Sequence, residues 1–359
     1  VVVAPRPSRL QAFHQGCGRC PAELRCSPDT MPAAEHVIIR DLLAKKTGWI
    51  SGNVLAAKLG ISRVAVWQHM EKLRAAGFSF EARRARGYRL KGQPATLHGD
   101  LIEAQLKVAP RNFSLLLLDQ VDSTNEEAAR QLGAGRPVPF AVLARCQSLG
   151  RGRFGRSWHS ESRGNFYASF AFRPRVSPDH MQTFTLWMGL NVCELITRFI
   201  GIAPGIKWPN DILFEGRKAG GMLTEARVDA DQIRDLVFGL GLNVNAPASS
   251  MPAGLARKSV SLADVAGAPV DLNRLAAAVI GRVLIAYDMF VAGEHLKTFA
   301  DLWHRYDLLR DKSVTLIEGG RRHHGTVRGL DDKGALLLRD EQGKARRFRA
   351  GEVTLEKAG

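Results

Sequence analysis

Apolar residues at helical spacing mark the first patterned part of the chain. Ile38 with Leu42, and Leu55 with Leu59, each lie one turn apart, which predicts two short helices. A glycine then breaks the chain, and a third amphipathic helix is predicted over residues 63–76. Its predicted buried stripe is Val66, Met70 and Leu73, and its outward residues are Arg63, Trp67 and Gln68. Helix, tight turn and helix is the arrangement that enters the major groove of DNA.

A predicted β-hairpin after the third helix gives this segment the form of a winged helix-turn-helix. Residues 78–90 alternate apolar and basic side chains. The arginines of this wing are Arg83, Arg84 and Arg86. Between Glu35 and Gly92, twelve Lys and Arg stand against four Asp and Glu, so half of the net charge of +16 lies in about a sixth of the chain. We therefore expect residues 32–92 to bind DNA, although winged helices also serve as protein-binding modules.

Continuous apolar runs alternate with polar motifs from residue 96 to residue 305. The predicted strands are 113–118, 140–144, 165–172, 212–214, 222–228 and 236–245, and residues 182–199 predict a packed helix. The first run ends in Asp-Ser-Thr-Asn at 122–125, just before a helix predicted from Glu126. α/β folds bind ligands at the ends of their strands, so these hydroxyl and amide groups are candidate ligand contacts. Capping of the following helix would also explain them.

The loop from Leu149 to Ser160 interleaves three glycines with three arginines, and Trp158 follows them. Glycine lets backbone N–H groups approach a ligand closely, and the arginines surround that backbone with forked cations. The loop therefore suits an anion. It lacks the Gly-Lys-Ser/Thr of a P-loop and the strand-turn-helix context of a dinucleotide fingerprint. Taken alone, it fits a solvated basic loop or an RNA-contacting segment equally well.

Both ends of the chain differ from this central part. Residues 1–31 hold four prolines and no regular period, so we expect a disordered tail. A His-x2-Cys-x2-Cys-x5-Cys series from His14 to Cys26 could hold zinc, but such ligands usually belong to a folded knuckle, and we assign no metal site. Because Met31 directly precedes the first patterned helix, translation that starts there would make the tail an over-extended N-terminus. At the other end, residues 310–359 predict a small SH3-like barrel.

Composition restricts the class of protein. A chain of 359 residues predicts two or three domains, and 45% hydrophobic with 24% charged residues describes a soluble globular protein. No apolar run reaches the roughly 18 to 20 residues of a membrane span, and the tail lacks the apolar core of a signal peptide. Cys146 and Cys193 stand alone in the body of the chain, as expected in a reducing compartment. We therefore expect a cytoplasmic protein without membrane contact.

Five motifs resemble, in order and spacing, those of the biotin protein ligases. They are Asp-Ser-Thr-Asn (122–125), Gly-Arg-Gly-Arg-x-Gly-Arg-x-Trp (150–158), Lys-Trp-Pro-Asn-Asp (207–211), Lys-x-Gly-Gly-Met-Leu (218–223) and Gly-Leu-Gly-Leu-Asn (239–243). With the winged helix in front, the chain resembles the bifunctional branch, which combines biotin ligase and biotin operon repressor. The resemblance runs from about residue 35 to the C-terminus. It implies an α+β multidomain protein with a class II synthetase-like α/β catalytic domain at 96–305 and an SH3-like C-terminal domain.

The resemblance also implies an activity and its residues. It implies an ATP-dependent ligase that forms biotinyl-5′-AMP and transfers biotin to a lysine of a biotin carboxyl carrier protein, with Mg²⁺ as cofactor. A homodimer bound to operator DNA is implied for repression. Biotin is assigned to Ser123, Thr124, Asn125, Gln147, Gly150, Arg151, Arg153, Lys218 and Gly239. ATP is assigned to Arg156, Trp158, Asp211 and Asn243, and catalysis to Lys218 and Arg153. Ser148 and Leu149 depart from the family pattern and make the approach to the loop less polar.

The chemistry of these residues agrees with the implied reaction. A carboxylate must be activated as a mixed anhydride before it acylates a lysine, which brings it against a triphosphate. Fixed cations and backbone donors neutralise such developing charge. Two other functions stay open at this point. A lipoate ligase shares the catalytic fold, and a ligand-sensing DNA-binding repressor without useful catalysis would retain the same motifs.

Overall fold

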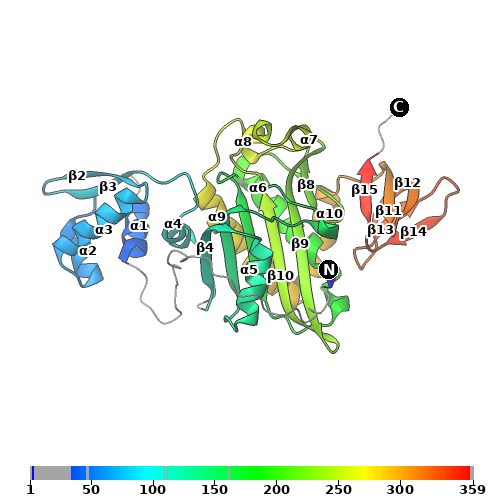
Figure 1. Ribbon diagram of the computed structural model, residues 1–359, viewed down its shortest axis with the longest axis horizontal. Coiled ribbons are helices and arrows are strands. Elements are labelled where there is room, and N and C mark those ends of the chain that lie inside the picture. The colour runs from blue at the N-terminus through cyan, green and yellow to red at the C-terminus, as the bar shows by residue number, and fades with distance from the viewer. Residues whose placement is uncertain are drawn as a thin grey trace, which may run out of the picture.

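The computed structural model describes residues 2–3, 34–45, 48–108, 110, 112–160 and 162–355. In this part of the chain, a helical module and a five-stranded β unit lie at opposite ends of an elongated molecule, with a mixed α/β body between them (Figure 1). This is the fold class expected from the sequence. The expected tail and its His and Cys series lie outside the described residues, except that β1 (Val2–Val3) pairs in parallel with β9 of the body.

The helical module is the predicted winged helix-turn-helix. It comprises α1 (Ala34–Ala44), α2 (Gly52–Leu59), α3 (Arg63–Ala75) and the antiparallel hairpin of β2 (Ser79–Arg83) and β3 (Gly87–Gly92). Ser62 begins α3 because its hydroxyl accepts a hydrogen bond from the Ala65 amide at 3.1 Å. Gly60 ends α2 with a left-handed φ of 66°, a conformation that favours glycine. The predicted stripe of α3 is buried in the core of the module.

A sheet with the order β4-β5-β6-β10-β9-β8-β7 forms the body, with β4 and β5 parallel and the remaining neighbours antiparallel. Its strands are β4 (Ser114–Val121), β5 (Phe140–Gln147), β6 (Phe166–Phe172), β7 (Gly205–Lys207), β8 (Asp211–Phe214), β9 (Arg217–Asp229) and β10 (Gln232–Leu242). Alternate residues of β5 face two separate apolar clusters, Ala141 and Leu143 in one and Phe140 and Val142 in the other. The predicted strands read as unbroken apolar runs because helices cover both faces of the sheet.

The helix α5 (Thr124–Gly133) covers one face of this sheet, and α6 (Phe184–Ile200) with α9 (Leu272–Val291) covers the other (Figure 1). The remaining helices of the described chain are α4 (Gly99–Gln105), α7 (Ala253–Ala256), α8 (Leu262–Ala266) and α10 (Phe299–Tyr306). Short 3₁₀ turns lie at Arg153–Gly155, Pro178–Met181, Ala248–Ser250 and Glu294–Lys297. In the described residues, no helix is both long and apolar enough to span a membrane.

The C-terminal unit is an antiparallel sheet with the order β14-β13-β12-β11-β15. Its strands are β11 (Ser313–Glu318), β12 (Arg321–Leu330), β13 (Leu336–Arg339), β14 (Ala345–Phe348) and β15 (Glu352–Leu355). Val314 and Leu336 belong to the same apolar cluster as the body, and the indole N–H of Trp208 donates to the Gly334 carbonyl at 3.2 Å. The unit is therefore packed onto the body. The sequence pattern predicts four short strands here, at 314–317, 326–329, 335–338 and 346–349, and β15 is an additional strand.

Several boundaries in the body differ from the expectation, and two of them fall within the polar motifs. Helix α5 begins at Thr124 rather than Glu126, so Ser123 is its N-cap residue and Thr124 and Asn125 lie in its first turn. Strand β9 begins at Arg217 rather than Met222, which places Lys218 inside the strand. The adjacent glycines, Gly220 and Gly221, pair with β8 and β10 on either side, so they extend the ladder instead of ending it.

Candidate active site

A cleft opens over β9 and β10, between the first turn of α5, the loop at 150–158 and the start of β15. The lining comes from six segments: 123–125 with Gln147, 151–158, 207–211, 218–223, 239–241 and 351–353. Tyr167 and Ala168 of β6 complete it. Every ligand residue proposed from the sequence lines this cleft except Gly150 and Asn243.

Buried hydroxyl and amide groups form one end of the cleft. Gln147 Oε1 accepts hydrogen bonds from the Thr124 amide at 2.8 Å and the Thr124 hydroxyl at 3.1 Å. Ser169 Oγ lies 2.8 Å from Thr124 Oγ1 and 2.5 Å from Asn125 Oδ1. Ser123 is 2% exposed, and its side chain makes no capping hydrogen bond to α5. Helix capping therefore does not account for the serine, and the network holds these groups at fixed positions facing the cleft.

Glycines let the floor and the loop of the cleft approach one another. A Cβ atom at Gly239 would collide with the Asn125 amide, and one at Gly241 would lie 2.7 Å from the Trp158 ring. Gly150 does not line the cleft, but a Cβ there would collide with the Trp158 carbonyl and the Ser160 hydroxyl. The glycines of both motifs are thus required by close packing around the cleft.

Cations gather at the other end of the cleft, and several are already paired. Lys218 Nζ lies 2.6 Å from Asp211 Oδ1, and Arg156 forms a forked ion pair with Glu352 of β15. Arg153 Nη1 donates to Asn210 Oδ1 and to the Gly351 carbonyl, each at 3.4 Å. The C-terminal unit therefore contributes a carboxylate and a carbonyl to this end.

Burial makes this cationic end electrostatically unusual. Desolvation is the main cause that lowers the pKa of Arg153 and of Lys207, although the Asp211 carboxylate opposes it in both. The hydrogen bond from Arg156 lowers the pKa of Glu352, so that this carboxylate stays ionised. The side chain of Lys207, in contrast to its backbone in the β7–β8 ladder, makes no hydrogen bond or ion pair with any residue that the structure describes. A half-buried cation without a partner is stabilised when an anion enters beside it.

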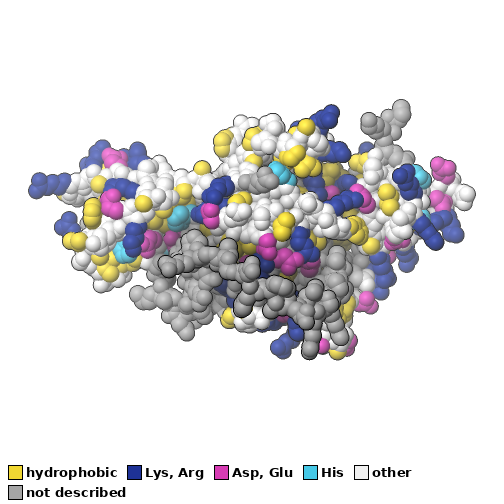
Figure 2. Space-filling model, in the orientation of Figure 1, with side chains coloured by type: hydrophobic (Ala, Val, Ile, Leu, Met, Phe, Trp, Pro, Cys, Tyr) yellow, Lys and Arg dark blue, Asp and Glu magenta, His cyan; other side chains and the backbone are white. Residues whose placement is uncertain are grey.

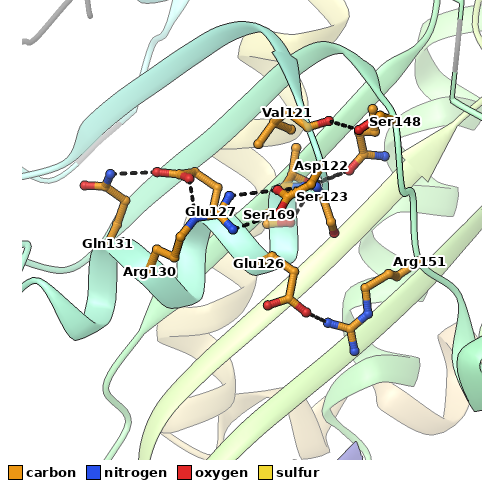
Figure 3. Close-up of polar contacts among 12 residues, drawn as sticks. Val121, Asp122, Ser123, Glu126, Glu127, Arg130, Gln131, Ser148, Arg151 and Ser169 are labelled. Carbon is orange, nitrogen blue, oxygen red and sulfur yellow. Dashed lines mark hydrogen bonds and ion pairs between the residues drawn. The ribbon is translucent and has the colours of Figure 1, made fainter. Parts of the chain in front are cut away.

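Arg151 belongs to the loop but is directed toward α5. Its guanidinium pairs with Glu126 (Figure 3). It also pairs with Glu225 Oε1 at 2.7 Å, and Glu225 accepts a hydrogen bond from Asn125 at 2.8 Å. These contacts tie the loop to the polar end of the cleft. Trp158 packs beside Lys218, whose Nζ lies 5.2 Å from the ring centroid. The indole N–H of Trp158 is buried and has no hydrogen-bond partner among the residues that the structure describes.

Comparisons with known proteins agree with this division of the chain. Family models match at three places: "HTH domain" at 35–89, "Biotin/lipoate A/B protein ligase family" at 117–243 and "Biotin protein ligase C terminal domain" at 311–355. The "Bifunctional ligase/repressor BirA" of Bacillus subtilis is 33% identical over 82% of this chain and 90% of its own. That of Escherichia coli is 30% identical over 86% and 93%. The chain belongs to the bifunctional biotin ligase/repressor family.

A solved structure of a biotin protein ligase also resembles this chain. The biotin protein ligase from Aquifex aeolicus, solved in complex with biotin and ATP, is 27% identical to this chain. It superposes with a TM-score of 0.58 and covers 68% of this chain and 99% of its own. That relative therefore corresponds to about two thirds of the present family member.

Several residues around the cleft of this family member were not identified from the sequence. Lys207, Ser169, Glu225 and Glu352 contribute to the network or to the cationic end. Lys207 opens the Lys-Trp-Pro-Asn-Asp motif, so its position was a usable signal. The other three stand in strands without a motif of their own. Conversely, Asn243 is buried, and its amide donates to the Lys218 and Val260 carbonyls, which supports the strand behind Lys218.

The second candidate site is the outer surface of the helical module. Arg63, Trp67 and Gln68 are exposed on α3, and Arg83, Arg84 and Arg86 are exposed on the hairpin. Lys and Arg side chains project from the outer end of this module in Figure 2. Arg83 Nε donates to Glu81 at 2.8 Å, whereas Arg84 and Arg86 make no ion pair with a described residue. The two wing arginines without a partner are thus the more available cations.

Proposed function

We propose that the protein joins biotin to AMP at the cleft, transfers the biotinyl group to a lysine of a biotin carboxyl carrier protein, and represses transcription through its winged helix. The observation that carries the proposal is that one cleft has buried hydroxyl and amide groups at one end and cations at the other. The buried hydroxyl and amide groups suit a small ligand with a ureido group, which both donates and accepts hydrogen bonds. The cationic end suits phosphates.

The first step brings two anions together. The biotin carboxylate attacks the α-phosphorus of ATP, and pyrophosphate leaves. Lys218 and Arg153, which line the cleft, would balance the negative charge where the carboxylate meets the α-phosphate. Arg156 and Lys207 would hold the leaving phosphates. Binding of ATP exchanges the Glu352 carboxylate for phosphate oxygens at Arg156, because both anions compete for the same guanidinium.

Mg²⁺ fits the same end of the cleft. This ion binds through one or two carboxylates together with substrate phosphates, and Asp211 with the adjacent Asn210 amide offers suitable oxygen atoms. When bound, the ion supplies positive charge to the leaving pyrophosphate. Lys218 pairs with Asp211 at 2.6 Å in this structure. Once Asp211 binds the ion, Lys218 would be free to contact the carboxylate of biotin.

The second step needs an incoming amine and no covalent enzyme intermediate. The amine of the carrier lysine attacks the acyl carbon of biotinyl-AMP, AMP leaves, and the amine loses a proton to form the amide. The loop at 150–158 would shield the adenylate from water until the carrier arrives. On the helical module, α3 would enter the major groove of operator DNA and the hairpin would contact phosphates.

The direct test of the ligand assignment is adenylate formation. The purified protein is incubated with ATP and Mg²⁺ and with either biotin or lipoate, and acyl-AMP and pyrophosphate are measured. We expect biotinyl-AMP from biotin and no acyl-AMP from lipoate. Lipoyl-AMP as the main product would replace the proposal with a lipoate ligase, and no adenylate from either acid would leave a sensing repressor without catalysis.

A further inference from the structure

The segment that joins the hairpin to the body, residues 93–98, is held along its length by the body. Gln93 donates to the Asp271 carboxylate at 2.8 Å, and Arg145 donates twice to the Leu97 carbonyl, at 3.0 and 2.7 Å. Leu97 itself is fully buried in the core of the body. These hydrogen bonds and the burial of Leu97 distinguish the segment from a flexible linker, whose backbone stays solvated.

Asn273, in the first turn of α9, makes the largest share of these contacts. Its amide nitrogen donates to the Pro94 and Thr96 carbonyls at 3.0 Å each, and its Oδ1 accepts the His98 amide N–H at 2.8 Å. The side chain is 1% exposed. Only a carboxamide supplies two donors and an acceptor from one short side chain, so aspartate at this position would oppose two carbonyls with a carboxylate.

The same segment also contacts the helical module. The His98 ring, whose backbone Asn273 holds, packs edge-on against Phe78 at a centroid distance of 5.2 Å. Directly after it, α4 is divided between the two units: Leu101 belongs to the core of the module and Ile102 to the core of the body. His98 and α4 therefore transmit the position of α9 to the module (Figure 1).

We propose that Asn273 is a positioning residue for DNA recognition, which fixes the orientation of the winged helix relative to the catalytic body. This inference rests on the proposed DNA-binding function. Two domains joined by a linker move relative to one another unless the interface prevents it. When two copies bind one operator, a fixed orientation restricts them to one distance between half-sites. Loss of the three hydrogen bonds would let each module adapt to other distances.

The test compares three forms of the full chain. Asn273→Ala removes the three hydrogen bonds to the linker. Asn191→Ala is the matched control, because Asn191 is also a buried asparagine of the body, but its amide donates to the Trp187 carbonyl, away from the linker. Arg145→Lys is a second variant that keeps a cation for Asp119 but loses the forked contact with Leu97. Adenylate formation is measured first, to show that each form is folded and active.

Each form is then bound to a DNA duplex selected from a random pool, with the distance between its two halves changed one base pair at a time. For wild type and Asn191→Ala we expect one optimal distance. For Asn273→Ala, the affinity for the duplex with the best distance, divided by the affinity for the duplex with the second-best distance, should fall toward one. The same ratio should also fall for Arg145→Lys. A ratio equal to that of the wild type in both linker variants would overturn the inference.

Small-angle X-ray scattering of the same samples gives a readout that needs no DNA. The wild type should fit a single arrangement, and Asn273→Ala should require an ensemble with a larger maximum dimension. If wild type binds no duplex, the proposed repressor function fails, and scattering alone decides the inference. Identical scattering from wild type and Asn273→Ala would then overturn it.

Discussion

At the scale of single residues, the cleft separates two kinds of cation. Lys218 lies in strand β9 and pairs with Asp211, whereas Arg153 lies in the loop and is held by two contacts of 3.4 Å. A strand residue has a fixed position during the reaction, and a loop residue can close after the ligand has entered. Removal of Lys218 and removal of Arg153 should therefore affect different steps of the reaction.

Lys218→Ala should slow the formation of biotinyl-AMP. It removes the fixed cation beside the reacting carboxylate, which by comparison with a lost oxyanion donor costs about 3 to 4 kcal/mol, or a rate loss of about 10² to 10³. The measurement is the initial rate of pyrophosphate release. Lys258→Ala is the control, because Lys258 is exposed and does not line the cleft, although its backbone carbonyl accepts the Lys218 N–H at 2.7 Å. A Lys218→Ala rate within the range of this control would contradict the assignment.

Arg153→Gly should instead weaken retention of the adenylate. Lys218 and Asp211 remain in place, so synthesis continues, but the loop no longer closes on the product with a guanidinium. Escaped biotinyl-AMP then acylates exposed lysines of other proteins. Labelling of a bystander protein, measured by mass together with adenylate formation, tests this difference. Equal loss of synthesis in Arg153→Gly and Lys218→Ala, with no bystander labelling, would show that the two cations share one role.

The residues that could be predicted from the sequence are those within compact motifs. Ser123, Thr124 and Lys218 line the cleft as expected because each stands in a short stretch of unusual composition. Glu352 could not be found in this way, because it reaches the cleft only through the docking of the C-terminal unit. Asn243 lies outside the lining of the cleft, where its amide donates to backbone carbonyls, so its assignment to ATP stays a prediction.

At the scale of elements, the amphipathic pattern was sufficient for α3, which buries one face in the core of its module. Continuous apolar runs were sufficient for the body strands except β7, which is too short to give such a run. The beginning of β9 was misjudged for a physical reason. Gly220 and Gly221 favour a turn when read alone, but here they allow close packing against Leu242 and Trp158. Sheet pairing on both sides then keeps the segment extended.

The hairpin β2–β3 carries the next prediction. Arg84→Ala and Arg86→Ala should each reduce the slope of log affinity for DNA against log salt by about 1, because each arginine would neutralise one phosphate. Arg83→Ala should have a smaller effect, since Arg83 already pairs with Glu81. Binding to operator duplexes over a salt series gives the slopes, with exposed Arg305→Ala as control. Equal slopes for wild type and both wing variants would contradict a phosphate-binding wing.

The contact between α1 and α4 predicts a dependence of stability on pH. Burial, and next the nearby Asp100, raise the pKa of Glu103 from its ordinary 4.5 to about 7, and His36 Nδ1 lies 3.7 Å from the Glu103 carboxyl. Because the folded protein holds this proton more tightly, the stabilisation is complete below pH 4.5 and is lost as the pH rises through about 7.

Glu103→Gln should remain neutral across this range. Its melting temperature relative to wild type should therefore increase between pH 5 and pH 8, because only the wild type acquires a buried charge over about this interval. Differential scanning calorimetry at several pH values measures it, and Glu341→Gln, an exposed glutamate of the C-terminal unit, is the control. A difference from wild type that stays constant with pH would contradict the assigned pKa.

At the scale of the whole molecule, the winged helix-turn-helix lies at one end and the C-terminal unit at the other, with the body between them (Figure 1). The body and the C-terminal unit together line the cleft. The order of these units was predictable because each has its own pattern of apolar residues. Their mutual orientation was not, since it depends on contacts such as Asn273 with the linker and Glu352 with Arg156, which join residues far apart in sequence.

The transfer reaction tests the central claim most directly. Full-length protein is incubated with biotin, ATP, Mg²⁺ and a purified apo carrier domain, and the intact mass of the carrier is measured, with a carrier whose acceptor lysine is replaced by arginine as control. The account predicts the gain of one biotinyl group on the wild-type carrier, dependent on ATP, and none on the arginine carrier. A carrier mass that stays unchanged, while the enzyme is folded and biotin and ATP are present in excess, would contradict it.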